Sequence, residues 1–109
     1  MVKIRNNKIS ITRGDTLETK VSIKMSDGED YIPSEEDQIR FALKQDYDDE
    51  EPLIVKVIPY DTLILRLEAA ETKELEVGRY VYDIELTTPD GFVDTFIDKQ
   101  SLTITEEVH

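Results

Sequence analysis

The side chains that could support catalysis are few in this sequence. Its single histidine, His109, is the last of 109 residues, and chain ends are usually the least ordered part of a domain. No serine therefore has an internal histidine to act as its general base, and no motif indicates a lysine that could replace it. The sequence predicts a protein that is not an enzyme and has no small-molecule substrate.

Residues 46–51 form an acidic run that contains one tyrosine. Carboxylate oxygens are the ligands that hard cations prefer, and Asp46, Asp48 and Asp49 are the candidate ligands. The run lacks the glycine and the terminal glutamate spacing of an EF-hand loop. Its composition favours a solvated loop, with calcium binding as the alternative. We expect no cofactor.

A second group of carboxylates, Asp83, Glu85 and Asp94, falls on two neighbouring predicted strands. Paired carboxylates can hydrolyse glycosides when they lie roughly 5–10 Å apart in a cleft. Here they alternate with apolar positions, which places them on a solvated sheet face. The sequence therefore favours pairing with lysine or arginine across strands.

The element that positions these carboxylates is the stretch 75–94, read as a long strand, a tight turn and a return strand. Four inward positions recur with the period of two that is typical of a half-buried strand: Tyr80, Tyr82, Ile84 and Leu86. The turn is predicted at Pro89, Asp90 and Gly91, because proline presets φ at the first turn position and glycine accepts a left-handed one.

The start of this strand is similar to the corner that opens the F strand of immunoglobulin-like sandwiches. In that corner, a tyrosine two residues before a core position bonds its hydroxyl to upstream backbone. Gly78 and Tyr80 fit the pattern, and Tyr82 would occupy the core position where antibody domains have cysteine.

Shorter alternating stretches predict the remaining strands, and good helix formers predict one short helix near residues 68–74. Turn signals roughly every 8–12 residues are typical of a sandwich. We therefore predict one all-β domain over residues 1–109, an immunoglobulin-like antiparallel sandwich of about seven to eight strands. Apart from the long strand, the predicted strands are 2–5, 9–12, 17–25, 38–44, 53–58, 63–67, 92–97 and 101–106.

The charge is strongly negative and unevenly placed. Thirteen basic and 25 acidic side chains give a net charge of −12, which repels nucleic-acid phosphates and anionic lipid. We expect neither nucleic acid nor a membrane as a partner, and no apolar run approaches the ~20 residues of a membrane helix. Residues 1–25, however, carry six basic and only two acidic side chains.

Outward basic residues and loop tyrosines together suggest a surface for protein contacts. A basic sheet face can meet the acidic loops of another copy head to tail, and loop tyrosines add large contact area at small entropic cost. The residues predicted to form this surface are Lys20, Lys24, Arg40, Lys44, Tyr47 and Tyr60.

Turn and strand-start motifs extend over nearly the whole chain. They are Arg13-Gly14-Asp15-Thr16, Asp27-Gly28-Glu29-Asp30-Tyr31-Ile32-Pro33, Ile58-Pro59-Tyr60-Asp61-Thr62-Leu63, Leu65-Arg66-Leu67, Glu71-Thr72-Lys73-Glu74-Leu75, and residues 78–86, 90–97 and 104–108. In these motifs the chain resembles a family of small proteins encoded in phages and prophages of Gram-positive bacteria.

That resemblance implies an immunoglobulin-like or baseplate-upper-protein-like domain of the kind used in phage tails and baseplates. It implies a virion structural role, partners among other phage structural proteins or copies of the chain itself, and a place in the virion or in the host cytoplasm during assembly. It carries over no catalytic residue. The alternative is a module that binds carbohydrate or the host surface, which the scattered tyrosines and the lack of tryptophan disfavour.

Overall fold

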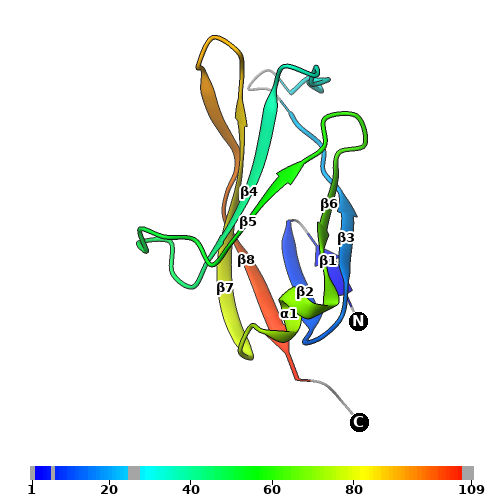
Figure 1. Ribbon diagram of the computed structural model, residues 1–109, viewed down its shortest axis with the longest axis vertical. Coiled ribbons are helices and arrows are strands. Elements are labelled where there is room, and N and C mark those ends of the chain that lie inside the picture. Colours follow the sequence, from blue (N-terminus) through cyan, green and yellow to red (C-terminus); the bar gives the residue numbers. More distant parts are fainter. Residues whose placement is uncertain (1, 6, 25–27, 107–109) are drawn as a thin grey trace.

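The computed structural model describes residues 2–5, 7–24 and 28–106 and shows eight strands and one short helix (Figure 1). The all-β prediction and the short helix are confirmed. The elements are β1 (Val2–Arg5), β2 (Lys8–Thr12), β3 (Leu17–Lys20), β4 (Gln38–Lys44), β5 (Ile54–Ile58), β6 (Ile64–Leu67), α1 (Ala69–Lys73), β7 (Gly78–Thr87) and β8 (Val93–Thr105).

The strands form two sheets of unequal size. The large sheet has the order β1-β2-β8-β7-β4-β5, and the small one consists of β3 and β6. β6 also contacts β5, so the small sheet adjoins one edge of the large, curled sheet (Figure 1). Every pairing between strands is antiparallel except that of β2 with β8, a parallel pair that the antiparallel prediction did not include.

β7 is the strand on which the core is built. From Tyr80 to Thr87 its side chains alternate between buried and partly exposed, and it lies between β4 and β8 in the large sheet. The Phe41 ring of β4 lies 5.5 Å from that of Tyr82, centroid to centroid. Buried side chains of the small sheet, including Leu17 and Leu65, belong to the same core. Burying apolar side chains of this size contributes roughly 1.5–3 kcal/mol each.

The start of β7 contains the glycine and the tyrosine of the predicted corner. Gly78 has a φ of +154°, which side chains disfavour. Two residues later, the Tyr80 hydroxyl donates a 2.7 Å hydrogen bond to the backbone carbonyl of Glu76, as a corner requires. Tyr82 lies in the core with 3% of its surface exposed, and its hydroxyl donates to the Asn7 carbonyl in the β1–β2 turn.

The predicted tight turn follows β7. The Gly91 N–H donates to the Thr88 carbonyl at 2.9 Å, and Gly91 has a left-handed φ of +87°. The Thr88 hydroxyl donates to the Asp90 carboxylate, and this bond lowers the pKa of Asp90. Phe92 then leads into β8.

β8 differs from the prediction, because the two strands predicted over residues 92–97 and 101–106 are parts of one continuous strand, Val93–Thr105. The register between β7 and β8 shifts on both sides of Ile84: Asp98 and Lys99 both lie opposite Asp83, and Phe96 is an extra residue between the partners of Ile84 and Glu85. Lys99 adopts a left-handed φ of +52°, and its N–H donates a 2.8 Å hydrogen bond to the Asp83 carboxylate. This β-bulge bends the strand without ending it.

The strand predicted over residues 17–25 ends at Lys20 in the structure. Val21 still donates to the Leu63 carbonyl at 2.7 Å, but Tyr31 donates to the carbonyl of Ile23 at 2.9 Å. The chain therefore leaves β6 for a new partner within a few residues. Met25, the last residue of the predicted strand, lies outside the described residues.

We expect the corner bond to contribute measurably to stability. Tyr80→Phe removes the hydroxyl and leaves the Glu76 carbonyl without that donor, at an expected cost of about 1 kcal/mol in the free energy of unfolding. Urea denaturation measures the loss. The matched control is Tyr60→Phe, because Tyr60 is exposed and lies in a turn. If Tyr80→Phe and Tyr60→Phe have the same free energy of unfolding, the Tyr80 hydrogen bond does not stabilise the fold.

Candidate functional site

The outer side of β5 carries apolar side chains that face solvent. Val55 and Val57 are 43% and 63% exposed, and Leu53, just before the strand and two residues from Val55, is 52% exposed. Ile58 points to the other side of the strand and is buried in the core. We call Leu53, Val55 and Val57 the outer strip. Because β5 ends the strand order of the large sheet, the strip lies at a sheet edge.

Charged side chains of β4 and β7 lie beside the outer strip. The register pairs Val57 with Arg40, and Arg40 in turn with Glu85. The Arg40 Nη1 atom is 3.8 Å from the Glu85 Oε1 atom, the cross-strand pairing that the sequence predicts for Glu85. A shallow hollow of about 240 Å³ lies here. It is lined by Arg40, Lys44, Glu50, Asp83, Glu85, Ala42 and Pro52. Its mixed charges suit polar contacts with a partner surface.

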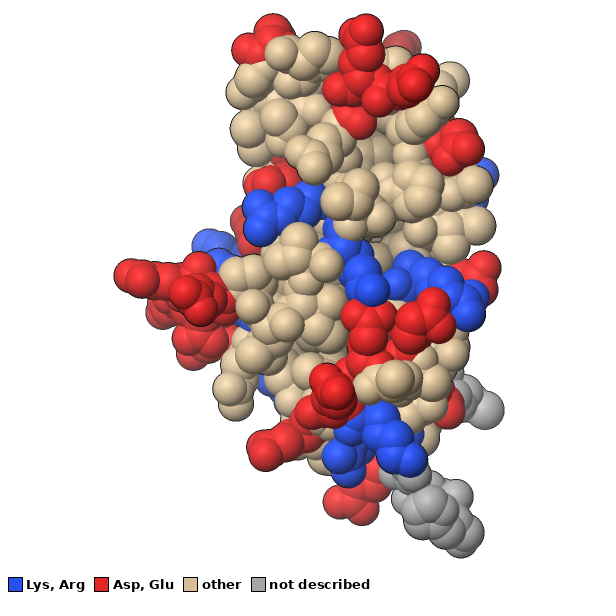
Figure 2. Space-filling model, viewed as in Figure 1, with Lys and Arg blue, Asp and Glu red and all other residues tan. Residues whose placement is uncertain are grey.

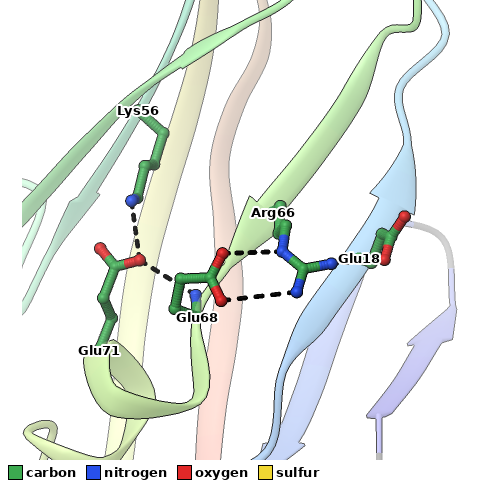
Figure 3. Close-up of polar contacts among 5 residues, drawn as sticks. All are labelled: Glu18, Lys56, Arg66, Glu68 and Glu71. Atoms are coloured by element: carbon green, nitrogen blue, oxygen red, sulfur yellow. Dashed lines mark hydrogen bonds and ion pairs between the residues drawn. The ribbon is translucent and has the colours of Figure 1, made fainter.

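Two further basic residues, Lys56 and Arg66, belong to an ion-pair cluster (Figure 3). The Lys56 Nζ atom lies 2.7 Å from the Glu71 Oε1 atom, and Arg66 lies 2.8 Å from Glu68 and 2.9 Å from Glu18. The Glu68 N–H also donates to the Glu71 carboxylate at 3.0 Å. Hydrogen bonding to Arg66 lowers the pKa of Glu68. The cluster joins β3, β5, β6 and the start of α1.

The basic side chains Arg40, Lys56 and Arg66 therefore each lie against acidic side chains of the same molecule. Figure 2 shows Lys and Arg side chains in a band across the middle of the molecule, with Asp and Glu side chains directly against them. Exposed pairs of this kind contribute roughly 0–1 kcal/mol each. The band is thus a mixed surface rather than a uniformly basic one.

The predicted contact residues lie in several separate places. Arg40 and Lys44 are on β4, next to the outer strip, whereas Lys20 and Lys24 are on β3 and just after it. Tyr60 lies in the turn after β5. The sixth, Tyr47, lies in the acidic loop after β4, where the Lys99 Nζ atom is 4.9 Å from the centre of its ring.

The acidic loop is held by its own hydrogen bonds. The Asp46 N–H donates to the Asp49 carboxylate at 3.1 Å, and the Asp49 N–H donates to the Asp46 carbonyl at 3.0 Å. Within residues 2–5, 7–24 and 28–106, no three acidic, histidine or cysteine side chains come together as a possible metal site. The structure therefore does not gather Asp46, Asp48 and Asp49 into a ligand set.

The three carboxylates Asp83, Glu85 and Asp94 each have a different neighbour in the structure. Glu85 faces Arg40, and Asp83 accepts the Lys99 N–H. Asp94 lies opposite Leu86 at the far end of β7. The sole histidine, His109, lies outside the described residues, as do Asp27, Glu107 and Val108 of the motifs quoted above.

The sequence did not single out the outer strip. Residues 53–58 are apolar at every position except Lys56. The sequence predicts that this lysine points outward, which implies that Leu53, Val55 and Val57 face the core. That prediction is wrong, because Val55 and Val57 are exposed and Ile58 is buried. The signal was that the side of the strand shared by Ile54, Lys56 and Ile58 is also mostly apolar.

Comparisons with known proteins give no match: no protein family, no curated protein and no solved structure is significantly similar to this chain. Among the described residues, no helix has the length and apolar character needed to cross a bilayer.

Stability at high pH should depend on Tyr82. Burial raises the pKa of its hydroxyl from 10.0 to about 12. Above pH 10 the unfolded chain therefore loses this proton while the folded protein keeps it. The Tyr82 contribution is fully present below pH 10 and is lost as pH rises towards 12, with a slope of at most about 1.4 kcal/mol per pH unit.

Denaturant unfolding at a series of pH values between 9 and 12 tests this expectation, with tyrosinate absorbance as a direct readout of ionisation. Tyr82→Phe should flatten the alkaline decline relative to the unsubstituted protein, although it lowers stability at neutral pH. Tyr60→Phe is the control and should leave the decline unchanged. If both variants decline as steeply as the unsubstituted protein, Tyr82 is not the group responsible.

Proposed function

We propose that this protein is a non-enzymatic structural or assembly module of a phage or prophage particle, associated with the tail or baseplate. It acts through contacts with other phage structural proteins or with further copies of itself. The motifs that resemble phage and prophage proteins support the particle assignment. The immunoglobulin-like arrangement is part of the proposal, supported by the Tyr80 corner and the turn at Gly91.

The single observation that carries the contact role is the outer strip. Exposed apolar patches with a polar rim mark sites of protein interaction. Here Leu53, Val55 and Val57 face solvent together on the outer side of β5. The charged residue of β5 itself, Lys56, is engaged by Glu71.

The rim of the strip adds selectivity to the contact. Arg40 and Lys44 lie next to the apolar side chains and share a hollow with Glu50, Asp83 and Glu85. Acidic groups of a partner would complement the two basic side chains, and basic groups would complement the three carboxylates. The acidic loop of another copy would supply the acidic groups, and a contact between two different patches builds rings or filaments of copies.

Replacing the outer strip should weaken association without unfolding the protein. We expect the double variant Val55→Glu with Val57→Glu to raise the dissociation constant at least tenfold, about 1.4 kcal/mol. Sedimentation equilibrium over a salt series measures it, first on the protein alone and then with the structural proteins encoded beside it. The control is Val77→Glu with Val93→Glu, at residues 48% and 53% exposed elsewhere on the surface.

If the protein alone is a monomer at every concentration and salt, and the outer-strip variant binds the neighbouring structural proteins as well as the control does, the contact role of the strip is wrong. Thermal unfolding of both double variants must match that of the unsubstituted protein, since all four valines are exposed.

The particle assignment has a separate test in the flanking genes. A structural module of a phage or prophage should be encoded next to capsid, tail-tube or tape-measure genes. Sequencing outward from the coding region is the measurement. If metabolic genes flank the coding region on both sides, the assignment to a phage particle is wrong. The contact role of the outer strip would still be tested separately by sedimentation.

A further inference from the structure

A groove opens between the small sheet and the upper part of β8. Its volume is about 420 Å³, and apolar side chains from both sheets form much of its lining. Leu65, Tyr82 and Ile84 are core residues, whereas Phe96 and Ile97 of β8 are only partly buried. We call this the seam groove. Its lining residues are Asn7, Ile9, Thr19, Lys20, Val21, Ser22, Lys24, Leu65, Tyr82, Ile84, Phe96 and Ile97.

The backbone beside the seam groove has open edges. β2 pairs with β8 only from Leu102 to Thr105, so among the described residues no strand covers that side of β8 over residues 93–101. On the other side of the groove, β3 has β6 as a neighbour and no second strand in the described part of the chain. An extended segment in the groove would continue the sheet position that β2 occupies further down.

The charge of the groove is opposite to that of the chain. Its lining contains two lysines and no carboxylate, although the protein carries a net charge of −12. Lys20 forms no ion pair within the described residues. Lys24 lies 3.4 Å from Asp30, but both side chains are more than two-thirds exposed, so solvent screens this pair and it exchanges readily.

We propose that the seam groove binds an extended strand of a partner protein in which apolar residues alternate with glutamate or aspartate. The apolar side chains would pack on Val21, Phe96 and Ile97, and the alternate carboxylates would pair with Lys20 and Lys24 of the lining. Main-chain hydrogen bonds to the open edge of β8 supply affinity, as in other cases of strand addition. This inference rests on the proposed function, because it names the partner chemistry of a contact module.

The same features argue against other occupants. A phosphate group or nucleic acid would leave the apolar floor uncovered, and a small apolar ligand would leave both the backbone edge and the lysines without partners. The acidic loop of another copy has the right charge, but residues 46–51 offer a single apolar side chain, Tyr47. A strand with apolar side chains at every second position fits all three features.

The test uses two synthetic peptides of about eight residues, a typical strand length. One alternates valine with glutamate, and the other alternates valine with lysine. Calorimetry measures binding to the full chain, and amide hydrogen exchange followed by NMR reports where the peptide lies. We expect the glutamate peptide to bind and to protect amides of residues 93–101, and the lysine peptide to bind at least tenfold more weakly.

The double variant Lys20→Glu with Lys24→Glu should weaken binding of the glutamate peptide about tenfold, since two charge contacts become repulsive. Lys8→Glu with Lys73→Glu is the matched control, because it makes the same change in net charge at exposed lysines outside the groove. This control should bind like the unsubstituted protein.

Equal binding of both peptides, no protection of residues 93–101, or equal losses in the two lysine variants would each overturn the proposal. Protection confined to β5 would also overturn it, because the peptide would then occupy the outer strip. The Val55→Glu, Val57→Glu variant separates the two proposals. Suppose that this variant still binds the glutamate peptide, and that the unsubstituted protein neither associates with itself nor binds the neighbouring structural proteins. The proposal for the seam groove is then supported, and the proposed contact role of the outer strip is wrong.

Discussion

A buried tyrosine hydroxyl must find an acceptor, and in this protein two such hydroxyls fix the position of the central strand. Tyr80 ties the start of β7 to the backbone carbonyl of Glu76, and Tyr82 reaches from the same face of β7 to the carbonyl of Asn7. An unpaired hydroxyl in the core would cost roughly 1–3 kcal/mol. Shifting β7 by one residue would place both hydroxyls on the opposite face of the sheet. These two bonds, together with the apolar side chains of the same face, therefore disfavour a one-residue slip of β7.

The parts of the fold that follow from local pattern could be predicted from the sequence. Alternation from Tyr80 to Leu86 identified β7 and its inward face, and the proline and glycine between residues 88 and 92 identified the turn. β8 could not be predicted as one strand, because the bulge at Asp98 and Lys99 changes which parity faces inward. In the sequence, such a change of parity is indistinguishable from a loop between two strands.

The candidate sites were harder to predict, because they depend on residues far apart in the chain. The outer strip requires knowing which side of β5 faces the core, and both sides of that segment are largely apolar in the sequence. The seam groove combines residues from Asn7 to Ile97, and no local pattern relates them. The sequence did indicate the excess of positive charge near the N-terminus. The structure places two of those lysines, Lys20 and Lys24, in the lining of the groove.

The parallel pairing of β2 with β8 has a mechanical consequence. β2 lies near the beginning of the chain, and Leu102–Thr105 lie near its end. A force that pulls the start of β2 away from the end of β8 acts along both strands, so it loads their hydrogen bonds in shear. Bonds in shear must break together, whereas a hairpin such as β1–β2 can unzip one bond at a time. Tension between the two ends would therefore peel β1 away first and then meet the stronger resistance of the β2–β8 ladder.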